Sequence, residues 1–209
     1  MLAEGHTYCI LVLTALLKRL RFAAVAVLLL FIGHSAFAQK VALKNNLLYD
    51  AALTPNLTLE WYLAEQWTMQ VEAGFNPFPL DDDKEHKWRH VLVDLEAKYW
   101  FCRAFVRDFV GVNVAYSHFN VSGGNYPIGW LYKDVKDHRL QGDMVAAGAS
   151  YGWHFIVSPH VSFELEAGCD VGYAWFNRYD CGRCGSKIDS PRKWFAVPKA
   201  GVNLVIMLK

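Results

Sequence analysis

The sequence predicts an all-β fold, an eight-stranded antiparallel up-and-down transmembrane β-barrel, and three observations indicate it. Apolar and polar side chains alternate with a period of two over long segments beyond residue 39, as expected of strands with two different faces. Several segments exceed the five or six residues usual in soluble sheets and suit the roughly 9 to 11 residues that cross a bilayer. Short and long connections alternate, which is the plan of outer-membrane barrels, although the first outer connection, residues 51–55, is a short exception.

Each alternating segment is expected to form one strand. The clearest are residues 67–76, 91–99 and 161–173, in which the charged side chains share one face. No segment competes convincingly as a helix. The eight predicted strands span residues 41–50, 56–63, 67–76, 88–101, 108–119, 139–156, 160–176 and 194–208.

The first residues have the features of a signal peptide that is removed on export. A basic cluster at 18–21 precedes the apolar run 22–32, and residues 36–38 (Ala-Phe-Ala) have the small-x-small pattern of a cleavage site. The run is too short for a membrane helix, which needs about 20 residues. We therefore expect a signal peptide over residues 1–38 and one barrel domain over residues 39–209.

Composition argues against a nucleic-acid partner. The chain has 21 Lys and Arg against 20 Asp and Glu, and it has no basic stretch of the kind that phosphate binding requires.

Aromatic residues gather near both sets of strand ends, where a membrane has its two interfaces. The alternative is a soluble sandwich or lipocalin-like barrel, whose aromatic side chains belong to the core. The first group is Tyr49, Phe75, Trp88, Tyr116, Phe119, Tyr173, Trp175 and Trp194, and the second is Trp61, Trp67, Trp100, Phe101, Trp153 and Phe155.

A membrane barrel turns its apolar face outward, so its polar face lines the interior. Because eight strands enclose a space that side chains just fill, we expect interlocking ion pairs and hydrogen bonds and no water-filled pore. Lys98 and Lys199 would be among the cations that balance the carboxylates. The predicted interior residues are Glu60, Gln70, Glu72, Asp94, Glu96, Lys98, Asn113, Glu164, Glu166, Asp170, Lys199 and Asn203.

Residues 42–51 (Ala-Leu-Lys-Asn-Asn-Leu-Leu-Tyr-Asp-Ala) and 55–57 (Pro-Asn-Leu) resemble the opening of an outer-membrane barrel family of unknown function common in Bacteroidota. Later landmarks at 76–78, 87–90 and 99–102 follow in the same order. The resemblance implies a small OmpA-like barrel with no established activity or cofactor. The last strand, with Lys199, Gly201, Leu204 and Ile206, looks like the signal read by the barrel-assembly machinery, but residues 207–209 lack its terminal aromatic. Some members occur near fimbrial assembly proteins, which implies a surface or envelope-organising role.

Cys181 and Cys184 form the one compact motif with reactive potential. A zinc site would need further ligands, and a redox motif would need a helix start in a thioredoxin-like context. A local loop disulfide or two free thiols is the preferred interpretation.

The acidic run Asp81-Asp82-Asp83 offers oxygen ligands of the kind that calcium or magnesium prefers. Its spacing does not match a calcium loop, so we interpret it as a solvated loop tip that meets lipopolysaccharide through cations. We therefore predict no metal site and no cofactor.

Ser117 and His118 are the nearest candidates for the hydrolytic chemistry of lipid A-modifying barrels. They are adjacent on a predicted strand, so their side chains point to opposite faces and cannot pair as nucleophile and base. Aromatic and basic residues in loops 120–138 and 177–193 are suited to glycans, protein partners or anionic headgroups.

The sequence thus predicts a non-enzymatic protein of the bacterial outer membrane. Its expected partners are outer-membrane lipid and lipopolysaccharide, the barrel-assembly machinery, and fimbrial or other envelope proteins. Two alternatives stay open: a lipid A-modifying hydrolase or acyltransferase, and a soluble periplasmic barrel that binds an apolar ligand.

Overall fold

The computed structural model describes residues 40–77, 79–81, 86–122, 138–180 and 185–208. The predicted signal peptide lies outside these residues. Among the described residues, no helix has the length and hydropathy needed to cross a membrane.

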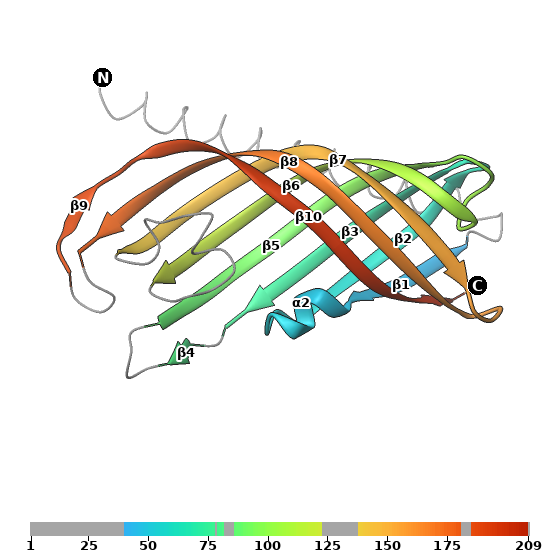
Figure 1. The fold of residues 1–209 in the computed structure, drawn as a ribbon, viewed down its shortest axis with the longest axis horizontal. Coiled ribbons are helices and arrows are strands. Elements are labelled where there is room, and N and C mark those ends of the chain that lie inside the picture. Colours follow the sequence, from blue (N-terminus) through green and yellow to red (C-terminus); the bar gives the residue numbers. More distant parts are fainter. Residues whose placement is uncertain (1–39, 78, 82–85, 123–137, 181–184, 209) are drawn as a thin grey trace, which may run out of the picture. The chain divides into compact units, whose positions relative to one another are not determined.

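Eight long antiparallel strands form a closed ring in which each strand pairs with its neighbours in chain order (Figure 1). The ring closes because the last strand pairs with the first, with Asn203 opposite Asn46. Two three-residue strands lengthen the hairpins at the end of the ring that carries the long connections, which we call the loop end. The opposite end, with the short connections, is the turn end. The long strands are β1 (Val41–Asn46), β2 (Asn56–Ala64), β3 (Trp67–Asn76), β5 (His86–Trp100), β6 (Arg107–Ser122), β7 (Arg139–Ile156), β8 (Val161–Tyr179) and β10 (Arg192–Met207), and the short ones are β4 (Pro79–Asp81) and β9 (Lys187–Asp189).

This arrangement confirms the all-β antiparallel prediction, with one correction. The strand predicted over residues 41–50 ends at Asn46, where the short helix α2 (Leu47–Ala51) begins. The Asn46 side-chain oxygen accepts a hydrogen bond from the Leu48 N–H at 3.1 Å, which caps one of the donors that a helix start leaves unpaired. The prediction that no helix forms is therefore wrong at this position.

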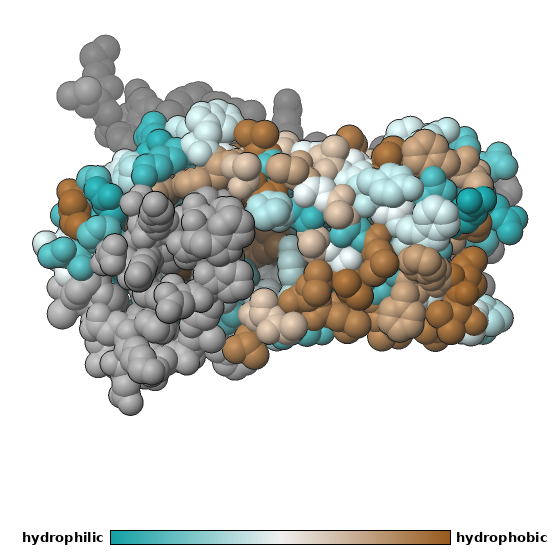
Figure 2. Space-filling model, in the orientation of Figure 1, coloured by the Kyte–Doolittle hydropathy of each residue, from teal (hydrophilic) through white to brown (hydrophobic). Residues whose placement is uncertain are grey.

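The two faces of each strand have opposite character, as β6 illustrates. Asn113 and Ser117 point into the ring and are buried, whereas Val112 and Val114 point outward and are 61% and 60% exposed. Figure 2 shows hydrophobic side chains gathered on the visible surface toward the end that carries the C-terminus. At mid-height the strands are thus apolar on their outward face and polar on their inward face.

Apolar clusters occupy the interior on either side of the polar residues. Along β5, Trp88 packs against one cluster and Trp100 belongs to the other, with Asp94, Glu96 and Lys98 between them. The clusters contain Ala42, Trp100, Ala104, Phe105, Phe109 and Val205 at the turn end, and Val121, Leu140, Ala174 and Phe176 at the loop end.

Four of the aromatic residues predicted for membrane interfaces lie on the inner side instead, one of them Tyr49 of helix α2, beside Glu72. Trp100 is completely buried, and Trp88 and Phe119 pack against the inner cluster at the loop end. The physical reason is the period of two: Trp100 lies two residues beyond Lys98, so both side chains point into the ring.

Candidate functional site

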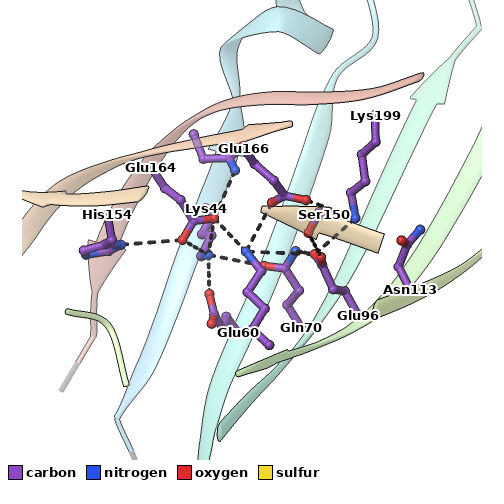
Figure 3. A network of polar contacts seen from close by, with 12 residues as sticks. Lys44, Glu60, Gln70, Glu96, Asn113, Ser150, His154, Glu164, Glu166 and Lys199 are labelled. Carbon is purple, nitrogen blue, oxygen red and sulfur yellow. Dashed lines mark hydrogen bonds and ion pairs between the residues drawn. The ribbon is translucent and has the colours of Figure 1, made fainter. Parts of the chain in front are cut away.

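Two lysines hold the centre of the interior network, and both contact Glu164 on β8 (Figure 3). The Lys44 ammonium, from β1, lies 2.8 Å from each Glu164 carboxylate oxygen and also pairs with Glu60. The Lys98 ammonium, from β5, lies 2.7 Å from Glu164 Oε1 and 3.2 Å from Glu166 Oε2. The arrangement joins four strands through charged contacts.

Neighbouring side chains complete the solvation of these buried charges. Lys98 Nζ also lies 4.0 Å from the centroid of the Phe109 ring, a cation–π contact. Trp100 Nε1 donates to Thr68 Oγ1 at 2.8 Å, and the Thr68 hydroxyl bonds Glu60. Buried ion pairs need such additional partners because removing charges from water costs several kcal/mol per ion.

A glycine on β6 allows the Glu96 side chain, from β5, to reach β7 inside the ring. Ser150 Oγ donates to Glu96 Oε1 at 2.5 Å, and Gln70 Nε2 donates to Glu96 Oε2 at 2.6 Å. On β6, which lies between the strands of Glu96 and Ser150, a Cβ at position 111 would clash with the Glu96 carboxylate. The residue there is Gly111, so the carboxylate can lie over the backbone of β6.

The part of the network nearer the loops is more acidic and less completely paired. Lys199 Nζ lies 3.1 Å from Glu96 Oε2 and 3.4 Å from Asp94 Oδ2. Asn113 Nδ2 donates at 3.0 Å to Asp94 Oδ2 and at 3.0 Å to Asp170 Oδ2. Glu72 stands directly opposite Asp94 on the neighbouring strand.

Helix α2 brings Tyr49 to the side of this acidic region. Burial raises the pKa of the Tyr49 hydroxyl above its ordinary value, and the negative charge of Glu72 raises it further. Tyr49 therefore remains a neutral phenol, which adds no charge to the acidic region.

Every predicted interior residue lies inside the ring, together with other members of the network that the prediction does not include. Lys44, Ser150 and His154 are buried there as well, and His154 Nδ1 lies 3.5 Å from Glu164 Oε2. Each has the alternation of its strand's inward face, as Lys44 does between Ala42 and Asn46. Their even spacing from known inward residues of the same strand is the sequence signal that predicts these three additional members.

The rim candidates are separated by the ring wall. His118 Nδ1 lies 2.8 Å from Asp143 Oδ1 on the outer surface, and Tyr116 Oη donates to the same oxygen at 2.6 Å. Ser117 is buried on the inner face. The structure therefore brings together a histidine and a carboxylate but keeps the predicted serine away from them.

Other sequence candidates fall outside the described residues. They include Cys181 and Cys184, Asp82 and Asp83, and the greater part of the loop at 120–138. Among the described cysteines, Cys102 and Cys169 are exposed and form no disulfide.

Fold and site together define an all-β protein whose eight-stranded antiparallel ring buries a charged network. The chain belongs to the family described as "Protein of unknown function (DUF3575)", whose model matches residues 23–208. No curated protein and no solved structure matches it.

Proposed function

We propose that the chain is a non-enzymatic outer-membrane β-barrel, exported by a signal peptide, that anchors its loops at the bacterial surface. The observation that carries this proposal is the inversion of the two faces, with exposed valines such as Val112 and Val114 outside and charged residues inside. Soluble monomers rarely expose contiguous apolar patches larger than a few hundred Å². A hydrocarbon environment accounts for such a surface.

The closed ring also supports a membrane location. In a bilayer every backbone N–H and C=O needs a partner within the protein, and a closed antiparallel ring supplies one along its spanning strands. Aromatic pairs stand toward both ends of the outer surface: Trp67 and Tyr99 have centroids 5.2 Å apart near the turns, and Tyr173 and Trp194 have centroids 4.8 Å apart near the loops. Membrane interfaces select for such residues.

The packed interior favours an anchor over a channel. Lys44, Lys98 and Glu164 fill the centre of the ring with direct contacts, and apolar clusters lie on either side. We therefore propose that the partners meet the loop end. These are lipopolysaccharide and lipid of the outer leaflet, and fimbrial or other envelope proteins; the barrel-assembly machinery would insert the chain.

Gel migration tests this proposal most directly. The full chain is expressed in a bacterium with an outer membrane, extracted with detergent, and run with and without boiling. We expect recovery in the membrane fraction and a heat-dependent change in migration, because a closed hydrogen-bonded barrel resists detergent until it is heated. Recovery in the aqueous fraction with no change on boiling would support the periplasmic ligand-binding alternative instead.

A lipid-modifying enzyme is a second candidate because His118 and Asp143 form a hydrogen-bonded pair on the outer rim. Such a pair resembles the base and orienting acid of a hydrolase, but the nucleophile that it would activate is absent at Ser117, which points inward. We expect His118→Ala to leave the acylation pattern of lipid A unchanged, as measured by mass spectrometry. Ser117→Ala is the matched control, and a change in acylation with His118→Ala alone would favour the enzyme.

A further inference from the structure

The interior of the ring holds more negative than positive charge. In the described part of the chain, its cationic groups are Lys44, Lys98 and Lys199, and the histidines His90 and His154 also face it but are charged only when protonated. The carboxylates facing them are Glu60, Glu72, Asp94, Glu96, Glu164, Glu166 and Asp170. Uncompensated buried charge is strongly unfavourable, so the surplus calls for a further positive charge.

The surplus is concentrated around Asn113. The cations Lys44 and Lys98 bind the carboxylates nearer the turns, whereas no ion pair among the described residues reaches Asp170 or Glu72. Glu72 and Asp94 are directly opposite each other on β3 and β5, a like-charge pairing that destabilises a sheet.

Four buried oxygens in this region have no hydrogen-bond partner. They are Glu72 Oε1, Asp94 Oδ1, Asn113 Oδ1 and Asp170 Oδ1, and each of these residues is at most 7% exposed. The amide of Asn113 is oriented by its two donated bonds to Asp94 and Asp170, which leaves its oxygen as an acceptor. These four oxygens are therefore acceptors to which no described residue supplies a donor.

A glycine makes room for the Asp170 carboxylate. On β7, Gly148 lies between Asn113 and Asp170 in the register of the sheet. A Cβ at position 148 would clash with Asp170 Oδ1. The absence of a side chain lets the Asp170 carboxylate lean over β7 toward Asn113.

We propose that this region binds one divalent cation of the hard, oxygen-preferring class, Mg²⁺ or Ca²⁺, through the carboxylates of Asp94 and Asp170 and the amide oxygen of Asn113. Glu72 would face the ion and balance its charge. No group of three or more His, Cys, Asp or Glu side chains among the described residues could hold a metal by itself, so the ion keeps water molecules in its shell, as Mg²⁺ usually does. The proposal departs from the sequence-based prediction of no metal site.

Binding is tested on the full chain, folded in detergent, stripped with a chelator and titrated calorimetrically with MgCl₂ or CaCl₂. We expect saturable binding of a single ion per chain and a rise in the temperature of the heat-dependent gel shift as the ion is added. Choline chloride at equal ionic strength should produce neither effect.

The variant Asp170→Asn isolates the site, because Asp170 has no ion pair with another described residue whose loss would unfold the ring. We expect it to weaken the metal affinity by at least about tenfold while the metal-free protein still shifts on heating. The matched control is the triple variant Asp81→Asn, Asp82→Asn and Asp83→Asn, which neutralises the acidic run. It should retain the metal affinity of the parent protein.

Three results would overturn the proposal. They are no saturable binding, equal affinity in Asp170→Asn, or loss of binding only in the control variant. Stabilisation by mild acid with no response to either metal would assign the missing positive charge to protons. None of these results bears on the membrane location, which gel migration and fractionation test separately.

Discussion

Replacing Lys98 by Met is expected to lower the free energy of unfolding by about 3 to 5 kcal/mol, the range measured when one partner of a buried ion pair is removed. Lys98 is completely buried and its ammonium contacts both Glu164 and Glu166. The methionine fills a similar volume but leaves these carboxylates with less positive charge. Urea unfolding of the protein folded in detergent measures the effect.

The control is Lys187→Met, because Lys187 is exposed on β9 and surface changes usually stay within about 0.5 kcal/mol. Adding Glu164→Gln to Lys98→Met should recover part of the loss, because it lowers the surplus of negative charge that Lys44 is left to balance. A loss below about 1 kcal/mol in the single variant would mean that water or another cation replaces Lys98, contrary to the packed interior.

Replacing Val112 by Arg is expected to cost about 2 to 4 kcal/mol if the ring spans a bilayer, since that is the cost of Arg on the lipid face near the midplane. Val112 lies in the middle of β6 and points outward, with the small residues Ala97 and Ala149 opposite it on the two neighbouring strands. In water the same change at an exposed position would be close to neutral. Unfolding from lipid vesicles against unfolding of the parent protein gives the difference.

Val157→Arg provides the matched comparison, because Val157 is also highly exposed but lies in the hairpin between β7 and β8. The cost of Arg near an interface falls to about 0 to 1 kcal/mol. Equal effects at the two positions would contradict the membrane proposal.

The strands could be predicted from the sequence because a period of two directly records which face is polar. The inward set on β8, from Glu164 through Glu166 to Asp170, follows that period, with Gly168 as its one uncharged and only partly buried position. Helix α2 could not be predicted in this way, because a single turn is too short to show a helical period. Its signal is the Asn46 cap, which depends on one side chain.

Most members of the interior network could be predicted from the sequence, but the contacts between them could not. The alternation along a strand determines whether a side chain points into the ring. The stagger between neighbouring strands determines which other side chains it contacts there. Lys44 and Glu164 are 120 positions apart in the chain, and nothing local in either segment indicates their contact. The surplus of carboxylates around Asn113 likewise appears only after each lysine has been assigned to its acids.

The closure of β1 on β10 and the contact between Lys44 and Glu164 make the two ends of the domain depend on each other during assembly. Strand β1 can pair with β2 but lacks its second neighbour until β10 is made, and the Lys44 ammonium lacks Glu164 until β8 is made. Contacts of such long sequence separation slow folding, since the loop entropy is lost before they form. A chain that lacks only β10 would therefore lose the pairing that closes the ring as well as Lys199. It would form an open sheet whose edge strands, β1 and β8, lack the partner that β10 provides, and such edges tend to aggregate.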